Sequence, residues 1–332
     1  MSSPFFTVIC PFFNAEKYLD ESVQSVIKQS CTNWELILLD DGSEDGGLQK
    51  ANNWSERDER IKVFQHPGGM NKGVSASRNL GIKHAKAPWV AFLDADDVWL
   101  PEKLEKQQKA IKQVEEKDLV LIYCPTKVID ETGEFITERG GTKDHNPMFG
   151  IYGAGRPGFQ ENAFRWVIDK GFEAPTSSVV CRKDIIQQLG GFEEDMRFSE
   201  DALMWYRILE NGNMFFIEEP LVQYRVHLSQ WNAAATTKLK LTRRFIVYER
   251  LLQKTNRDHK SYVSFLLVNK GFRIITRSYI GYPYFNFKII GKYWKKVLKN
   301  DNVLFAHKIF SLLISVTEII ILPVRLMRGI VK

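Results

Sequence analysis

Short apolar runs alternate with segments of helical periodicity over the first 125 residues of the chain. The apolar runs, each typical of a buried strand, lie at 5–10, 35–39, 61–64, 89–93 and 119–123. Between them, apolar side chains recur at helical spacing from 19 to 29, from about 73 to 86, and after Pro101. This alternation predicts an α/β fold, with a mostly parallel sheet covered by helices on both faces.

Polar residues follow three of the predicted strands at the point where each strand ends. The three segments are Pro11-Phe12-Phe13-Asn14, Asp40-Asp41-Gly42-Ser43 and Asp94-Ala95-Asp96-Asp97. Because ligands of parallel sheets bind at the carboxyl ends of the strands, we expect all three segments to share one binding edge. The carboxylates at 94, 96 and 97 repel one another, and a divalent cation with oxygen ligands would relieve that repulsion. A solvated turn, with an Asp capping the helix after Pro101, is the alternative.

Residues 126–175 are rich in glycine, proline and aromatic residues and are the least readable part of the first 235 residues. The segment 153–158 matches the glycine spacing of a dinucleotide-binding loop, but Pro157 interrupts it and no clear strand-turn-helix unit surrounds it. We therefore expect a mobile loop over the binding edge. A strand is predicted at 176–181, a short helix up to 189, and another helix from 199, whose first turn carries Glu200 and Asp201.

The net charge of +6 conceals an acidic body and a basic C-terminal region. Residues 237–332 contain 20 Lys and Arg and 4 Asp and Glu. Residues 1–236 contain the remaining 26 Lys and Arg and 36 Asp and Glu. A region this basic predicts a polyanionic partner, either anionic lipid head groups or nucleic acid.

One apolar stretch near the C-terminus carries the membrane prediction. Residues 309–324 are apolar apart from Glu318 and small hydroxyls, and basic residues flank the stretch. Because it is short for a spanning helix, we expect it to lie on an anionic membrane surface. Packing into the core of the protein or into an oligomer interface is the alternative. The sequence thus predicts a catalytic domain over 1–235 and a basic, aromatic, mostly helical, membrane-associating region over 236–332.

The four cysteines are widely spaced and form no C-x-x-C pair, which predicts buried free thiols in a reducing compartment. The first residues lack the basic leader and long apolar run of a signal peptide. We therefore expect the catalytic part to lie in the cytoplasm, on the inner face of the cell membrane.

Read together and in order, these motifs resemble the family 2 glycosyltransferases of GT-A fold, a Rossmann-like fold of nucleotide-diphospho-sugar transferases. The resemblance covers residues 5 to about 230. It is carried by the segment from Val8 to Leu19, by Gln29, by the two acidic segments, and by Asn71-Lys72-Gly73-Val-Ser-Ala-Ser-Arg78-Asn79-Leu-Gly81.

The resemblance implies roles for particular residues of this chain. Asp41 would accept a hydrogen bond from the N3–H group of uracil, and the backbone of Pro11 would contact the donor. The residues implied in donor binding are Pro11, Phe12, Asn14, Asp40, Asp41, Lys72, Arg78, Asp94, Ala95, Asp96 and Arg225. Asp96 or Asp97, together with His227, would ligate Mn²⁺ or Mg²⁺. Asp201, with Glu200 beside it, matches the family's general base.

The implied activity is a metal-dependent, inverting transfer of a sugar from a nucleotide-sugar donor, a UDP-sugar, to a hydroxyl of a lipid-linked or polysaccharide acceptor. Such an enzyme would serve cell-surface glycan synthesis. Two other interpretations compete with it: a non-catalytic nucleic-acid-binding protein that uses the basic C-terminal third, and a sugar nucleotidyltransferase. The first interpretation expects no nucleic-acid partner, and formation of a homo-oligomer is left open.

Overall fold

A computed structural model describes residues 3–114, 117–139, 157–170, 174–227, 237–256, 259, 260 and 262–264. The chain divides after Ala234 into two units. In the second unit, α8 (Thr237–Lys254) lies in the region that the sequence predicts to be mostly helical. The predicted membrane-surface stretch at 309–324 lies outside the described residues. Within the residues described, no helix has both the length and the apolar character needed to cross a membrane.

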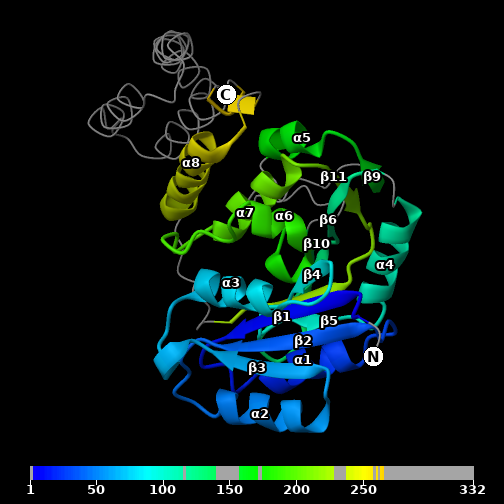
Figure 1. The fold of residues 1–332 in the computed structure, drawn as a ribbon, viewed down its shortest axis with the longest axis vertical. Coiled ribbons are helices and arrows are strands. Elements are labelled where there is room, and N and C mark those ends of the chain that lie inside the picture. The colour runs from blue at the N-terminus through cyan, green and yellow to red at the C-terminus, as the bar shows by residue number, and fades with distance from the viewer. Residues whose placement is uncertain are drawn as a thin grey trace, which may run out of the picture. The chain divides into compact units, whose positions relative to one another are not determined.

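The first unit is built on an eight-stranded sheet (Figure 1). Its strands, in spatial order, are β3 (Ile61–Gln65), β2 (Trp34–Asp40), β1 (Phe6–Phe12), β4 (Trp89–Phe92), β10 (Val180–Arg182), β6 (Leu119–Tyr123), β11 (Asn213–Phe216) and β9 (Gly158–Gln160). All run in one direction except β10 and β9, which are antiparallel to their neighbours. The predicted mostly parallel sheet is confirmed.

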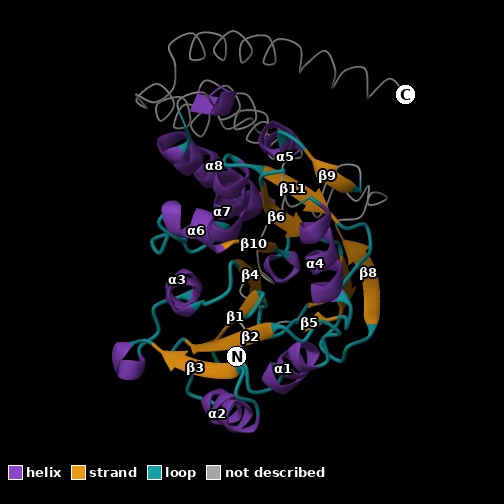
Figure 2. Ribbon diagram, turned by 45° about the vertical axis from the view of Figure 1, so that its right-hand side comes forward, coloured by secondary structure: helices purple, strands orange, loops and turns teal. Residues whose placement is uncertain are grey.

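Helices cover both faces of this sheet, as predicted (Figures 1 and 2). On one side lie α1 (Leu19–Ile27), α2 (Gly47–Arg57) and α4 (Lys103–Gln113), and on the other lie α3 (Val74–His84), α6 (Lys183–Gln188) and α7 (Glu200–Leu209). A further helix, α5 (Ala163–Lys170), contacts α7.

The alternation of side chains along β1 explains how one strand serves two layers. Phe6, Val8 and Cys10 are buried in the same core cluster as residues of α1 and α4. Ile9 points the other way, where a Cβ atom on Gly81 of α3 would lie 2.7 Å from its Cγ2. A side chain at position 81 would therefore push α3 off the sheet. The four cysteines are free and buried, as predicted.

A second, four-stranded sheet corrects part of the sequence interpretation. Its order is β5 (Val98–Trp99), β12 (Val222–Arg225), β7 (Thr126–Ile129) and β8 (Phe135–Arg139). Residues 126–175, where the sequence could not be interpreted, contain β7, β8, β9 and α5. Most of the segment 153–158, where a loop was predicted, lies outside the described residues. These short strands escaped detection because they lack long apolar runs and because β12, which pairs with β7, lies about a hundred residues away.

The predicted strand at 176–181 is also shorter than expected. Residues Thr176–Ser178 form a single 3₁₀ turn, and only Val180–Arg182 pair as β10. This turn contacts β4, and its hydroxyl groups reach the binding edge.

Candidate active site

Asp40 and Asp41, at the end of β2, have different hydrogen-bond partners. Asp40 is buried and accepts hydrogen bonds from the backbone N–H of Ser43 (2.9 Å) and from Gln65 Nε2 (2.7 Å). Asp41 accepts from the backbone N–H groups of Lys72 (2.8 Å) and Gly73 (2.9 Å), one on each oxygen. Asp41 thereby fixes the loop before α3. Each carboxylate oxygen can accept a second hydrogen bond, so the group retains capacity for a ligand.

The end of β1 offers a different aromatic side chain from the one predicted. Phe12 is buried in the core, whereas the next residue, Phe13, is 51% exposed. Side chains alternate between the two faces of β1, and position 12 continues the series 6, 8 and 10 that points into the core. This alternation predicts that Phe12 is buried. Pro11 is a buried residue of β1. It lies beyond the last residue of β1 that pairs with β4, so its lack of an N–H group costs no hydrogen bond between β1 and β4.

Asn14 links the first two strand ends. Its backbone is left-handed, with φ of 49°. Its N–H donates to Ser43 Oγ at 3.0 Å, and its Oδ1 accepts from the N–H of Glu44 at 2.8 Å. Asn tolerates this conformation better than most residues. Asn14 therefore orders the predicted donor-binding edge from within the protein.

The acidic segment after β4 contains two aspartates in opposite environments. Asp97 is fully buried: its Oδ2 accepts from Ser177 Oγ at 2.5 Å, and its Oδ1 accepts from the backbone N–H of Arg225 at 2.9 Å. Burial first, and then the charges of Asp96 and Asp94, raise the pKa of Asp97 well above its usual value. Because a metal ligand at this edge would need an exposed oxygen and Asp97 is fully buried, the structure does not support Asp97 as a metal ligand, and that role stays a prediction.

Asp96 pairs with His227, which follows β12. The side chain of Asp96 is 25% exposed, and its Oδ2 lies 3.0 Å from His227 Nε2. The ring centroid of His227 lies 5.0 Å from that of Tyr18. The sequence interpretation that groups residues 96 and 227 is therefore matched by their contact.

The donor set of this pair fits a divalent cation. A carboxylate oxygen and an imidazole nitrogen suit Mn²⁺, which accepts both ligand types. Among the described residues, no group of three or more His, Cys, Asp or Glu could hold a metal ion. Cations of this class commonly take one or two protein ligands and complete their coordination with substrate phosphates and water. Asp96 and His227 could thus supply two ligands of a cation, whose remaining ligands would come from substrate and water.

The two arginines predicted to bind the donor are engaged with protein groups. Arg78 is buried and donates to Asp94 Oδ1 (3.0 Å) and to Glu200 Oε1 (2.8 Å). The buried guanidinium of Arg225 donates to Glu21 and to backbone carbonyls. Contact of either arginine with the donor stays a prediction. The other predicted donor residues in these segments differ in exposure: Ala95 is buried and Lys72 is exposed.

The acidic pair at the start of α7 also divides into two roles. Glu200 is buried against Arg78. Asp201 is half-buried, with Oδ2 accepting from Thr176 Oγ1 at 3.0 Å. Burial, followed by the charge of Glu200, raises the pKa of Asp201 to about 7, against the opposing effect of Arg78. The helix begins where it was predicted, with Ser199 as a left-handed N-cap residue whose side chain makes no capping hydrogen bond.

The 3₁₀ turn at Thr176–Ser178 connects the two halves of the site. The Thr176 hydroxyl donates to Asp201, and the Ser177 hydroxyl donates to Asp97. The Ser177 hydroxyl also accepts a hydrogen bond from the N–H of Asp94 at 2.9 Å. Sequence reasoning missed both residues. Their only signal was a run of three small hydroxyl residues before an apolar segment, which is too common to be specific.

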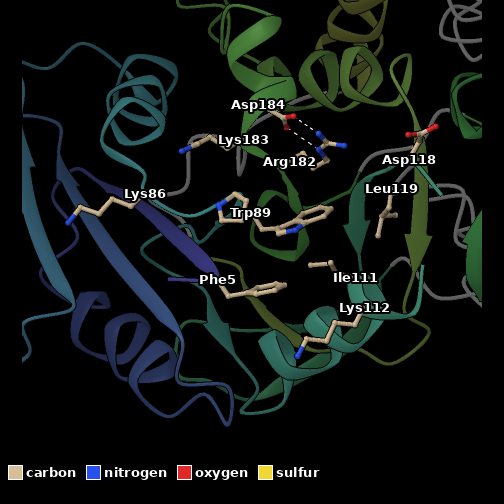
Figure 3. Close-up of a pocket in the computed structure, with 11 residues that line it drawn as sticks. Phe5, Lys86, Trp89, Ile111, Lys112, Asp118, Leu119, Arg182, Lys183 and Asp184 are labelled. Atoms are coloured by element: carbon tan, nitrogen blue, oxygen red, sulfur yellow. Dashed lines mark hydrogen bonds and ion pairs between the residues drawn. The ribbon is translucent and has the colours of Figure 1, made fainter. Parts of the chain in front are cut away.

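A separate pocket of about 830 Å³ lies at the opposite edge of the sheet (Figure 3). Phe5, Trp89 and Leu119, which line it, mark the amino ends of β1, β4 and β6. None of the predicted donor-binding, metal-binding or catalytic residues lines this pocket. The predicted site residues are therefore gathered at the carboxyl edge alone, as expected for this kind of sheet.

Sequence comparisons identify relatives of the chain. The family model described as glycosyl transferase family 2 matches residues 7–188. UDP-Glc:alpha-D-GlcNAc-diphosphoundecaprenol beta-1,3-glucosyltransferase WfgD of Escherichia coli is 28% identical, and the match covers 73% of this chain and 84% of the relative. Putative glycosyltransferase EpsE of Bacillus subtilis is 30% identical over 68% of this chain and 74% of the relative. The match spans only 42% of an uncharacterised glycosyltransferase of Haemophilus influenzae, at 43% identity.

Two solved structures resemble the fold of this chain. TarS of S. aureus, residues 1–349 in complex with UDP-GlcNAc, has a TM-score of 0.61 and 20% identity, covering 80% of this chain and 70% of that one. The mannosyltransferase PcManGT of Pyrobaculum calidifontis, in complex with GDP-Man and Mn²⁺, has a TM-score of 0.55 and 14% identity, covering 96% and 87%. At this identity the likeness shows a shared GT-A fold.

Proposed function

The chain belongs to glycosyl transferase family 2, and on this premise we propose that it transfers a sugar from a UDP-sugar to a hydroxyl of a lipid-linked or polysaccharide acceptor. One observation carries the proposal: Asp41, the Asp96–His227 pair and Asp201 come from separate elements and fall at one sheet edge. The names of the Escherichia coli relative and of the S. aureus complex support a UDP-linked donor, and the former supports a lipid-linked acceptor. The comparisons support neither the nucleic-acid-binding nor the nucleotidyltransferase interpretation.

The nucleotide part of the donor would bind at the ends of β1 and β2. The exposed ring of Phe13 offers a face on which a base can stack, and Asp41 offers acceptor capacity for an N–H of that base. Lys72 is exposed next to Gly73 and can bring positive charge to the phosphates. These groups bind and orient the donor without taking part in bond making.

Asp96 and His227 would hold Mn²⁺ or Mg²⁺ at this edge. Such a cation, when bound, offsets the negative charge that develops on the departing nucleoside diphosphate. The two side chains come from the β4 turn and from the residues after β12, so the fold fixes their separation before any ligand arrives. Preorganisation of this kind avoids a reorganisation cost during the reaction.

Asp201 is the proposed general base. Its carboxylate would take the proton of the acceptor hydroxyl while the hydroxyl oxygen attacks the anomeric carbon, opposite the leaving diphosphate. A single displacement of this kind inverts the anomeric configuration. Thr176 holds the carboxylate from one side, and the raised pKa gives Asp201 enough basicity for the task at neutral pH.

We further propose that the enzyme works at the inner face of the cell membrane as a peripheral protein. The excess of basic residues in 237–332 supports attraction to anionic lipids, and a lipid-linked acceptor would be found there.

The first test of the function is nucleotide binding. In titration calorimetry with UDP, GDP, CDP and TDP, we expect UDP to bind in Mn²⁺ and to bind more weakly in EDTA. Phe13→Ala should weaken UDP binding about five- to a hundredfold, because it removes a base-stacking ring. Phe135→Ala, which removes another exposed phenylalanine, should leave the affinity unchanged. If none of the four diphosphates binds, the proposed function is wrong.

The pH dependence of transfer should report the ionisation of Asp201. Because the carboxylate must be deprotonated to accept a proton, the rate should fall as the pH falls through about 7. The fall in rate at low pH is the acidic limb of the pH–rate profile. Thr176→Val removes a hydrogen bond that favours the carboxylate, so the midpoint of this limb should move to a pH about 0.4 to 1 unit higher.

Ser178→Ala is the matched control for Thr176→Val. The Ser178 hydroxyl belongs to the same 3₁₀ turn but donates to the carbonyl of Pro175. Its removal should leave the acidic limb in place. The role given to Thr176 would be contradicted if the midpoint of the acidic limb were unchanged in Thr176→Val, or if it shifted equally in both variants.

A further inference from the structure

Arg225 is a buried cation at the centre of a network beside the candidate metal pair. Its side chain is 2% exposed. Its Nε donates to the carbonyl of Asp96 at 2.9 Å, and its Nη2 donates to Glu21 Oε2 at 2.5 Å. Nη1 donates to the carbonyls of Asp130 and Glu131 at 3.3 and 3.4 Å. The guanidinium thus contacts three segments that are distant in sequence.

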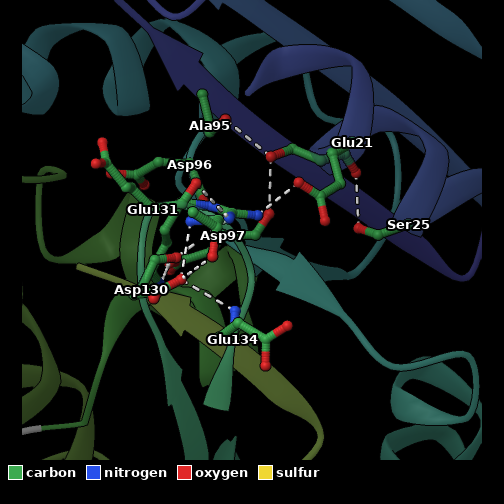
Figure 4. A network of polar contacts seen from close by, with 11 residues as sticks. Glu21, Ser25, Ala95, Asp96, Asp97, Asp130, Glu131 and Glu134 are labelled. Carbon is green, nitrogen blue, oxygen red and sulfur yellow. Dashed lines mark hydrogen bonds and ion pairs between the residues drawn. The ribbon is translucent and has the colours of Figure 1, made fainter. Parts of the chain in front are cut away.

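These segments surround the turn that carries Asp96. Figure 4 shows Glu21 of α1 on one side of the turn and Asp130 and Glu131, between β7 and β8, on the other. The backbone N–H of Arg225 also binds Asp97, so both the main chain and the side chain of Arg225 fix the turn.

Arg225 also determines where the imidazole partner of Asp96 lies. His227 follows Arg225 by two residues, and Tyr18 contacts both: its ring centroid lies 4.9 Å from the guanidinium carbon and 5.0 Å from the imidazole centroid. A displacement of Arg225 would therefore move the carbonyl side of Asp96 and the chain that carries His227 at the same time.

Glu21 supplies the carboxylate that compensates the buried charge. Three further acceptors of the guanidinium are backbone carbonyl groups, which carry no full charge. Glu21 is 54% exposed, so its own desolvation is modest. Removing one partner of such a pair leaves a buried charge without its counter-charge, and the surroundings must shift to hydrate it.

We propose that Glu21 and Arg225 are positioning residues, which hold the Asp96 carboxylate and the His227 imidazole at the separation needed to bind a divalent cation together with a diphosphate. This inference rests on the proposed function. It gives Arg225 a role different from direct contact with the donor. Residues that orient metal ligands through hydrogen bonds commonly contribute about ten- to a hundredfold to metal affinity.

The test is Mn²⁺ affinity, measured by the electron paramagnetic resonance signal of free Mn²⁺ in the presence of saturating UDP, or of the diphosphate that calorimetry selects. Glu21→Gln keeps the shape and an acceptor oxygen but removes the charge. Arg225→Lys keeps the charge but cannot contact all three segments. We expect both variants to bind Mn²⁺ about ten- to a hundredfold more weakly, while binding of the diphosphate in EDTA stays at the wild-type value.

Glu131→Gln is the matched control. It removes one carboxylate from the same region, but that carboxylate pairs with Lys17 on the surface, and Arg225 contacts only the Glu131 carbonyl. Its Mn²⁺ affinity should stay within about twofold of wild type, a change of less than 0.5 kcal/mol.

The outcomes separate the inference from the function on which it rests. Unchanged Mn²⁺ affinity in folded Glu21→Gln, or equal weakening in Glu131→Gln, would overturn the positioning role while leaving the proposed function in place. Failure of the wild-type protein to bind Mn²⁺ with any diphosphate would overturn both. Glu21→Gln keeps an acceptor oxygen for the guanidinium, and a cooperative unfolding transition would show that this variant is folded. It then decides the matter even where Arg225→Lys unfolds.

Discussion

Asp201→Asn should lower the rate of sugar transfer by about a hundred- to ten-thousandfold while leaving the dissociation constant of the donor unchanged. The substitution removes the group that takes the proton of the acceptor hydroxyl, and asparagine cannot take it. Donor binding should survive because the base and the phosphates contact other elements of the edge. The measurements are single-turnover transfer and calorimetric donor binding on the same preparation.

Asp118→Asn provides the control for this substitution. Asp118 is an exposed aspartate at the opposite edge of the sheet, with a left-handed φ of 49° that asparagine tolerates. Its replacement makes the same charge change and should leave transfer at the wild-type rate. Full transfer activity in Asp201→Asn would remove Asp201 from the mechanism. A parallel loss of donor binding would instead assign it to the donor site.

Asp96→Ala should remove the metal-dependent part of diphosphate binding and lower transfer by at least about a hundredfold. The alanine leaves His227 as the remaining ligand of the pair, and one imidazole holds Mn²⁺ weakly. Chelation of the wild-type enzyme with EDTA should give the same loss, and EDTA should have no further effect on Asp96→Ala. Calorimetry with and without Mn²⁺ makes both comparisons.

Asp97→Ala distinguishes the two neighbouring aspartates. It leaves the Ser177 hydroxyl and the Arg225 N–H without their acceptor in the interior. We expect a loss of about 1 to 3 kcal/mol in the free energy of unfolding, measured by chemical denaturation. Asp96→Ala, at a partly exposed position, should lose little stability. A reversed pattern, with metal binding lost only in Asp97→Ala, would assign the metal-ligand role to Asp97 instead of Asp96.

The predicted fold rests on short-range patterns that the sequence displays directly. Five apolar runs, separated by helical periodicity, determine a parallel sheet because each strand must return over a helix to pair in the same direction. The same rule places the ends of β1, β2 and β4 at one edge. Asp41 and Asp96 could therefore be assigned to one site before any contact was known. The alternation of β1 also separates Phe12 from Phe13, although the resemblance had favoured Phe12.

Asp201 was predicted as the base from resemblance, but its environment was not accessible from the sequence. Burial and the charge of Glu200 raise its pKa, whereas a hydrogen bond from a hydroxyl twenty-five residues earlier in the chain lowers it. Thr176 and Ser177 occupy a segment whose apolar neighbours predicted a plain strand. Only the 3₁₀ turn aims their hydroxyls at the two acidic clusters.

The sequence by itself determined which chemical groups the binding edge would hold, because strand ends and their residues are local features. Only the tertiary structure decided which of those groups face a ligand. Asp96 and Asp97 are adjacent, yet a turn directs one toward the edge and the other into the interior, where Arg225 binds it from 128 residues away. Local propensity carries no information about a partner so distant. That choice follows from the pairing of β12 with β5 and β7 in the second sheet.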